Sequence, residues 1–222
     1  MCCLNTHMIV SHEHRLIFTH IPKNAGTSIR TWLARHVPDS RDVPNASKHI
    51  TPHHVPELAG YTHFAVVRNP YDRLLSQYNF HVERYADYIR PKSKLSRKEQ
   101  YHEKHAELKK GFAYWLEHPY PIADRRAKWY DYRWCPQSVW CTQTTQVLKF
   151  ENLADDFQWV QDRVGVAEPL ETLNRTTANS DHTTAANRVM LADHRKLIQS
   201  HLMVDFKRFG YRPDFDRSGK NG

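Results

Sequence analysis

The sequence predicts an α/β fold, a single domain in which helices flank a central parallel sheet. Two short apolar runs, RLIFTHI (15–21) and THFAVVRNP (62–70), are typical of buried parallel strands. A segment with apolar residues at helical spacing follows each run. This alternation indicates parallel strands joined by right-handed crossovers. The 222 residues suit one such domain, with the ends at about 1–13 and 213–222 expected to be flexible.

The first helix is expected to begin at about Thr27, because hydroxyl side chains suit a helix N-terminus. The second is expected to begin at Pro70, because proline is well placed in a first turn. The later elements expected are a polar helix over 97–118, a strand over 145–150, a helix over 151–166 and a last helix over 187–210.

Composition narrows the classes of protein. The net charge of +8 predicts a polyanionic partner, which could be nucleic acid, an acidic glycan or a highly phosphorylated cofactor. The sequence has no apolar run long enough to span a bilayer and no signal peptide, so we expect a cytoplasmic protein without stable membrane insertion. The four cysteines lack metal-type or redox-type spacing and are expected to be reduced.

The stretch HIPKNAGTSI (20–29) joins the first strand to the first helix. A tight loop that enters a helix offers unpaired backbone N–H groups and a partial positive charge, which together favour an anion. The nucleotide-binding pattern GxxxxGK[ST] is absent, because Lys23 precedes Gly26. The alternative is an ordinary strand-to-helix turn with a surface lysine.

A second stretch, VVRNPYDRLLSQY (66–78), has Arg68 at the end of a strand and Ser76 two turns into the next helix. Open α/β sheets bind ligands beyond the ends of their strands, and arginine suits bidentate phosphate binding. The alternative is that Arg68 and Asp72 only pair locally and leave Ser76 exposed.

These two stretches resemble the 5′-phosphosulfate loop and the 3′-phosphate motif of sulfotransferases that use 3′-phosphoadenosine 5′-phosphosulfate (PAPS), of the carbohydrate-type, family 2 branch. Three further stretches resemble those of the same family and occur in the same order: PQSVW (136–140), VLKFENLADDF (147–157) and DFKRFGY (205–211). The resemblance therefore covers about 16–211. It implies a P-loop nucleotide-kinase-like fold and sulfuryl transfer to a hydroxyl, with a carbohydrate as the expected acceptor. Glycan enzymes of this family are usually anchored in Golgi membranes, so the lack of an anchor favours a bacterial or phage-like enzyme.

The resemblance also implies roles for single residues. The 5′-phosphosulfate would be held by Lys23, Asn24, Ala25, Gly26, Thr27 and Ser28. The 3′-phosphate would be held by Arg68 and Ser76. Asn24 stands at a variable loop position, so its backbone is the expected contact. Lys23 would also act in catalysis, by neutralising charge on the bridging and sulfonyl oxygens.

An acceptor hydroxyl needs a general base, and histidine is best suited to this role at neutral pH. The stretch KHITPHHV (48–55) contains three candidates, and His49 comes first because KHIT most resembles the family's Lys-His-x-Thr pattern. His53 and His54 follow, and Glu57 is a weaker alternative. Each of the three could equally be an ordinary surface or hydrogen-bonded histidine.

Further expectations concern ligands. The stretches HEKH (102–105) and HEH (12–14) do not make a convincing zinc site, so no metal is predicted. The aromatic stretch AKWYDYRWCPQSVW (127–140) could line an acceptor cleft, with Gln137 bonding to sugar hydroxyls, or could simply pack in the core. Two rival functions are a P-loop kinase that uses ATP and a basic nucleic-acid-binding module. We expect no nucleic-acid partner. The sequence makes no prediction about the oligomeric state.

Overall fold

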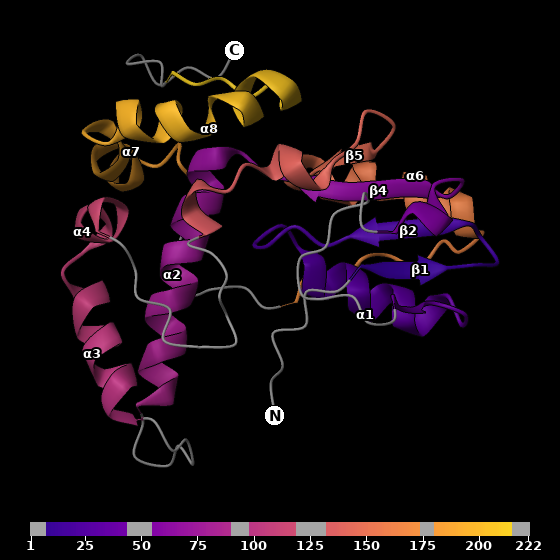
Figure 1. Cartoon of the computed structure of the whole chain (residues 1–222), viewed down its shortest axis with the longest axis horizontal. Helices are drawn as coiled ribbons and strands as arrows, with labels where there is room; N and C mark the ends of the chain where they lie inside the picture. Colours follow the sequence, from indigo (N-terminus) through magenta and orange to yellow (C-terminus); the bar gives the residue numbers. More distant parts are fainter. Residues whose placement is uncertain (1–7, 44–54, 90–97, 119–131, 174–179, 215–222) are drawn as a thin grey trace. The chain divides into compact units, whose positions relative to one another are not determined.

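The computed structural model describes residues 8–43, 55–89, 98–118, 132–173 and 180–214 (Figure 1). These residues group into two compact units. The first takes its described residues from Met1–Asn69 and Gln137–Arg175, and the second from Pro70–Pro136 and Thr176–Gly222. Within the described residues, no helix is both long and apolar enough to cross a membrane.

The first unit contains a five-stranded sheet in the order β3-β1-β2-β4-β5. Its strands are β1 (Ile9–Ser11), β2 (Leu16–Thr19), β3 (Arg41–Asp42), β4 (Thr62–Val67) and β5 (Gln146–Lys149). Parallel pairing of β4 with both β2 and β5 confirms the predicted parallel strands.

The sheet as a whole is mixed, so the prediction of a purely parallel sheet is wrong. β1 runs antiparallel to both β2 and β3. The reason is the four-residue turn from His12 to Arg15, which can join only antiparallel strands. The expected flexibility over 1–13 is also wrong for Ile9–Ser11, because these three residues are buried in the sheet.

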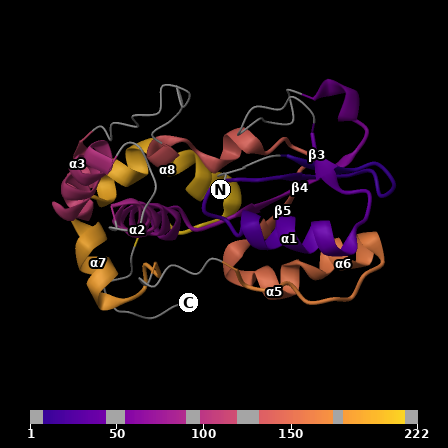
Figure 2. The ribbon, with the colours of Figure 1, turned by 90° about the horizontal axis from the view of Figure 1, so that it is seen from below.

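The two faces of the sheet are covered differently. The helices of this unit are α1 (Gly26–His36), α5 (Leu153–Asp156) and α6 (Gln158–Val164). Leu16 and Phe18 belong to a core shared with α1 and α6, whereas Ile17 belongs to a smaller cluster with the turn η2 (Pro56–Leu58). Figure 2 shows α1, α5 and α6 on one side of the sheet and the 56–58 turn on the other. The alternation follows from the period of two in a strand.

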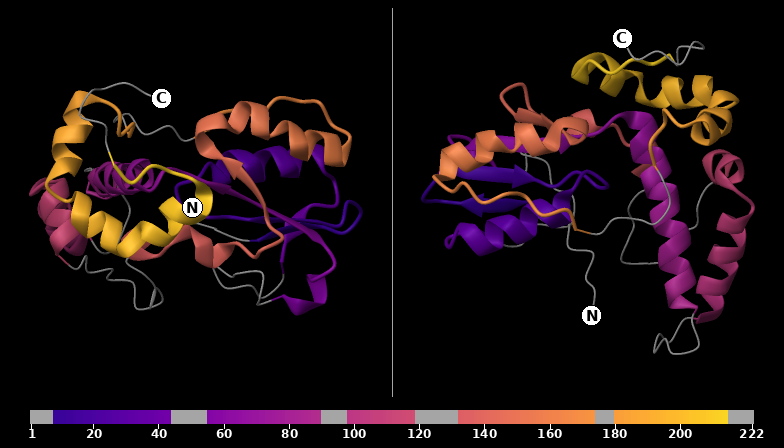
Figure 3. Two further views of the ribbon diagram at one scale, coloured as in Figure 1. Left: turned by 90° about the horizontal axis from the view of Figure 1, so that it is seen from above. Right: turned by 180° about the vertical axis from the view of Figure 1, so that it is seen from behind.

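The second unit is helical. Its helices are α2 (Pro70–Tyr88), α3 (Lys98–Lys109), α4 (Phe112–Glu117), α7 (Ala185–Ala192) and α8 (Arg195–Phe209), which are visible from two further sides in Figure 3. Short 3-10 turns complete both units: η3 (Tyr132–Trp134), η4 (Gln137–Trp140) and η5 (Phe150–Asn152). One apolar cluster joins the five helices of this unit through residues such as Tyr71, Trp115 and Phe206.

Three predicted helices are divided in the structure. The helix expected over 151–166 becomes the turn η5 and the helices α5 and α6, which are separated at Phe157. The helix expected over 97–118 breaks at Gly111, whose φ of 109° lies outside the helical region. The helix expected over 187–210 breaks at Asp193 and His194, between α7 and α8. The predicted glycine ends are confirmed, because Gly165 and Gly210 adopt the left-handed conformation at the ends of α6 and α8.

Candidate functional site

The loop from His20 to Ala25 joins β2 to α1 and has an unusual backbone. Lys23 and Ala25 have positive φ angles of 72° and 59°, a conformation that non-glycine residues rarely adopt. Ala25 is the N-cap of α1, and no side chain caps this end among the described residues. The first N–H groups of α1 therefore keep the ability to bind an anion. Backbone strain of this kind is concentrated at functional sites.

The side chain of Asn24 fastens this loop to the sheet. It is buried, and its Nδ2 donates to the carbonyl of Val66 at 2.8 Å and to Oε1 of Gln137 at 2.6 Å. Because the side chain points into the protein, the backbone of Asn24 is the part that can meet a ligand, and its contact with one stays a prediction. Oδ1 of Asn24 is buried and has no hydrogen-bond partner among the described residues.

Arg68 follows β4, and its backbone is held by the same glutamine. The N–H of Arg68 donates to Oε1 of Gln137 at 2.9 Å, and Nε2 of Gln137 donates to the carbonyl of Arg68 at 2.8 Å. Gln137 is completely buried. The expectation that Gln137 bonds to an acceptor sugar is therefore wrong, because its amide is enclosed and bonded within the protein.

The structure brings Lys23 and Arg68 together at the carboxyl ends of two adjacent parallel strands, β2 and β4. Nη1 of Arg68 donates to the carbonyl of Lys23 at 3.5 Å, and the guanidinium lies 4.2 Å from the centre of the Phe150 ring. The Arg68 guanidinium thus lies against the backbone of Lys23, in the loop that leads into the uncapped start of α1. This arrangement is suited to an anion with more than one charged group.

Gly26 has a close neighbour that the sequence did not reveal. A Cβ on Gly26 would overlap the imidazole ring of His20, which itself stacks on Phe18 with 6.0 Å between ring centres. A larger residue at position 26 would therefore require the His20 ring to move. The sequence singled out Gly26 only for its approach to an anion.

The two hydroxyl residues of the loop differ in exposure. Thr27 is exposed, whereas Ser28 is buried and its Oγ accepts a hydrogen bond from the N–H of Leu173 at 2.9 Å. The Ser28 hydroxyl can still donate its own proton. Both residues lie in the first turn of α1, as predicted.

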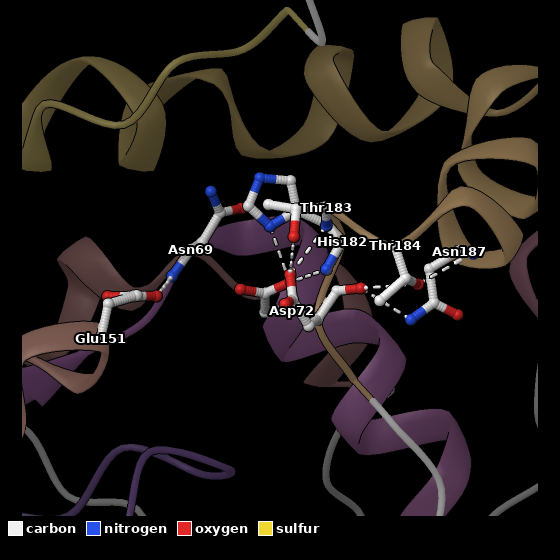
Figure 4. Close-up of polar contacts among 8 residues, drawn as sticks. Asn69, Asp72, Glu151, His182, Thr183, Thr184 and Asn187 are labelled. Carbon is white, nitrogen blue, oxygen red and sulfur yellow. Dashed lines mark hydrogen bonds and ion pairs between the residues drawn. The ribbon is translucent and has the colours of Figure 1, made fainter. Parts of the chain in front are cut away.

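Ser76 lies on α2, in the second unit, and is buried, so the alternative of an exposed Ser76 is wrong. One turn earlier on α2, Asp72 accepts two hydrogen bonds from His182, from its N–H at 2.6 Å and its Nδ1 at 2.8 Å (Figure 4). This contact ties the chain before α7 to the start of α2. Thr184 then caps α7 by accepting from the N–H of Asn187.

Glu151 is a further polar residue of the first unit that the sequence did not assign. Its Oε1 accepts a hydrogen bond from the N–H of Asn69 at 2.6 Å (Figure 4). The backbone on both sides of the Arg68 carbonyl is thus held by side chains, by Gln137 at Arg68 and by Glu151 at Asn69. The only signal in the sequence was that Gln137 and Glu151 lie in stretches that resemble those of the family, 136–140 and 147–157.

The predicted bases are not all within the described part of the chain. His49, His53 and His54 lie outside the described residues, so their prediction remains untested. Glu57, the weaker candidate, is exposed on the turn η2.

Two groups of three potential metal ligands occur within the described ranges. In each group the ligand atoms lie within 4.8 Å of one another: one group is Glu13, His14 and Asp39, and the other is Asp72, Asp181 and His182. The carboxylate of Asp39 already accepts hydrogen bonds from Ser11 and from the N–H of Glu13. Asp72 likewise bonds to His182. These contacts engage one carboxylate in each group, and the absence of a metal remains a prediction.

Comparisons with known proteins identify the family of the chain. Residues 6–212 match the model of the sulfotransferase family, so the chain belongs to that family and is an enzyme of the sulfotransferase class. Its curated relatives include carbohydrate sulfotransferase 11 of Mus musculus and that of Rattus norvegicus. Each is 24% identical over 238 residues, which span 92% of this chain and 67% of the relative. No solved structure gives a significant match.

Proposed function

We propose that this enzyme transfers the sulfuryl group of PAPS to a hydroxyl group of a carbohydrate acceptor. The observation that carries the proposal is the hydrogen-bonded network of Asn24, Gln137 and Arg68, which joins the loop before α1 to the end of β4. This network supports simultaneous binding of two phosphate-type groups. Membership of the sulfotransferase family supports PAPS as the donor, and the names of the relatives support a glycan acceptor.

In this proposal, the N–H groups at the start of α1, Lys23, Thr27 and Ser28 bind the 5′-phosphosulfate. Arg68 binds the 3′-phosphate, and Ser76 of the second unit is assigned to the same phosphate by the family resemblance. The acceptor oxygen forms a bond to sulfur while the bond from sulfur to the bridging phosphate oxygen breaks. Lys23 stabilises the negative charge that develops on that oxygen, and this electrostatic effect is the main contribution of the chain to the rate.

The acceptor proton must go to a base, and we propose His49 for this role, with His53 and His54 next. The leaving group is a stabilised phosphate, so transfer is proposed to require no metal. The family match over 6–212 spans both compact units, which supports a single sulfotransferase domain with a P-loop-like nucleotide site.

Titration calorimetry tests the donor site. We expect the wild-type chain to bind adenosine 3′,5′-bisphosphate in EDTA, and to bind it more tightly than Mg-ATP. Lys23→Ala and Arg68→Ala should each weaken this binding at least tenfold while the far-UV circular dichroism stays unchanged, because each removes a charged hydrogen-bond donor. Arg35→Ala is the matched control, because Arg35 pairs with Glu171 at the other end of α1.

A preference for Mg-ATP would favour the kinase alternative and contradict the proposal. Salt-sensitive binding to DNA or RNA that survives Lys23→Ala would instead indicate a nucleic-acid-binding module. Transfer of labelled sulfate from PAPS to glycans, compared with phenols, lipids and peptides, tests the acceptor class.

The base is tested by His49→Ala in single-turnover transfer of labelled sulfate. The rate of transfer should fall by about 100-fold or more, the usual contribution of a general base, while the affinity for adenosine 3′,5′-bisphosphate stays the same. His14→Ala is a control on a histidine outside the stretch 48–55. An unchanged rate would exclude His49 and make His53 and His54 the next variants to measure.

A further inference from the structure

The side chain of Gln137 is the point where three separate segments of the first unit meet. Gln137 begins the turn η4, Asn24 belongs to the loop before α1, and Arg68 directly follows β4. Oε1 of Gln137 accepts from both the Asn24 side chain and the Arg68 N–H, and Nε2 donates to the Arg68 carbonyl. A single carboxamide therefore satisfies groups on two segments that are 44 residues apart (68 − 24 = 44).

The bonds to Arg68 involve both of its backbone groups. A neighbouring β-strand holds a residue in the same way, through one N–H and one carbonyl. The β4–β5 pairing ends one residue earlier, at Val67 opposite Lys149. Gln137 thus extends the backbone support of β4 by one residue, to the residue that carries the guanidinium.

The burial of Gln137 makes these bonds costly to lose. The side chain is 0% exposed, so water cannot replace its amide groups if they are removed. A buried backbone group left without a partner is destabilising, and here the affected groups belong to Arg68 and to the Asn24 side chain. Loss of the Gln137 hydrogen bonds would change the position of the Arg68 backbone and of the loop that contains Lys23.

We infer that Gln137 is a positioning residue that sets the spacing between Lys23 and Arg68, and thereby the preference for a nucleotide with phosphates at both the 5′ and the 3′ position. The inference rests on the proposed function, because Lys23 and Arg68 are assigned to the two phosphates there. Gln137 itself touches no ligand, since its amide is bonded within the protein. Its effect passes through the backbone of Arg68 and through Asn24.

The test compares the affinities for adenosine 3′,5′-bisphosphate and adenosine 5′-phosphate by titration calorimetry, well below the melting temperature. Gln137→Met keeps the volume of the side chain and removes its hydrogen bonds. We expect Gln137→Met to weaken binding of the bisphosphate about tenfold and binding of the monophosphate less, so that the ratio of the two affinities falls. Gln161→Met is the matched control, because Gln161 lies in the same unit and its Nε2 donates to the carbonyl of Glu168.

A purely structural role would lower the melting temperature of Gln137→Met but leave the affinity ratio of the folded protein unchanged. That result would overturn the inference and leave the proposed function standing. If the wild-type chain does not bind the bisphosphate, the proposed function and this inference both fall. A fall in the ratio with Gln137→Met, but not with Gln161→Met, supports the inference.

A second variant keeps the inference testable if Gln137→Met does not fold. Asn24→Ala removes the hydrogen bond between the loop and Gln137, while the two bonds between Gln137 and Arg68 remain. It should lower the same ratio of affinities. If Gln137→Met does fold, the effects of the two substitutions should be less than additive, because both break the bond between Asn24 and Gln137. An unchanged ratio in Asn24→Ala would contradict a shared role.

Discussion

Gly26 and His20 show how a single contact determines the residue at the start of α1. Gly26 does not have a positive φ, so its backbone conformation alone does not require glycine. The preference for glycine comes from the His20 ring, which occupies the place of a Cβ and would have to move to admit one. The imidazole therefore lies directly against the first turn of the helix whose N–H groups are proposed to bind the phosphosulfate.

The contact predicts opposite effects of the same substitution in two backgrounds. In the wild-type chain, Gly26→Ala should destabilise the fold by roughly 1–3 kcal/mol, because the new methyl group overlaps the ring. In a His20→Ala background the same change should be neutral or stabilising by about 0.5–1 kcal/mol, because alanine is the better helix residue. Urea unfolding followed by circular dichroism measures both values, and equal destabilisation in the two backgrounds would show that His20 is not the cause.

The helices of the second unit are joined by a buried charge and by a tyrosine. Arg73 of α2 is buried, and burial lowers the pKa of its guanidinium while the carboxylate of Asp205 raises it. Asp205 belongs to α8 and is also buried. Burial likewise raises the pKa of Tyr71 to about 12, and its hydroxyl donates to the carbonyl of Pro213 at 2.6 Å. Tyr71 and Arg73 thus connect the first turns of α2 to α8 and to the chain that follows it.

For the packing of α2 against α8, we predict that Arg73→Met destabilises the protein by roughly 3–5 kcal/mol, because it leaves the carboxylate of Asp205 buried without its cation. The double variant Arg73→Met with Asp205→Leu should recover a large part of this loss, since no buried charge then remains. The free energy of unfolding in urea checks both. Arg195→Met, which alters a more exposed pair with Asp214, is the control and should change stability by less than about 1 kcal/mol. A double variant as unstable as the single one would argue against the pairing.

For the whole molecule, family membership covers both units, whereas the described contacts of the proposed donor site come from the first unit alone. The net charge of +8 is consistent with a donor that carries several negative charges and with an anionic glycan. The second unit supplies Ser76, with Asp72 and His182 holding the chain near the start of the same helix. Its contribution to the donor site is a prediction that Ser76→Ala can test in the same calorimetric measurement.

The sequence by itself determined the α/β class, the parallel pairing around β4, the glycine ends of two helices and the family. These depend on local pattern: apolar runs, residues at helical spacing, and motifs that are contiguous in the chain. It also singled out Lys23 and Arg68 as candidate phosphate ligands, because Lys23 lies in the loop between β2 and α1 and Arg68 directly follows β4. It could not predict β1 and β3, which are short and owe their formation to pairing partners elsewhere in the chain.

Only the tertiary structure decided the contacts of Gln137 and the neighbour of Gly26. Both depend on contacts between residues that are not neighbours in a motif: Gln137 meets Asn24 113 positions away, and the ring of His20 folds back over Gly26. A polar side chain in an aromatic stretch reads equally as a ligand contact or as a core residue until its burial is known. Burial and the direction of its hydrogen bonds are properties of the packed chain, and they replaced the expected sugar contact of Gln137 with bonds to Asn24 and Arg68.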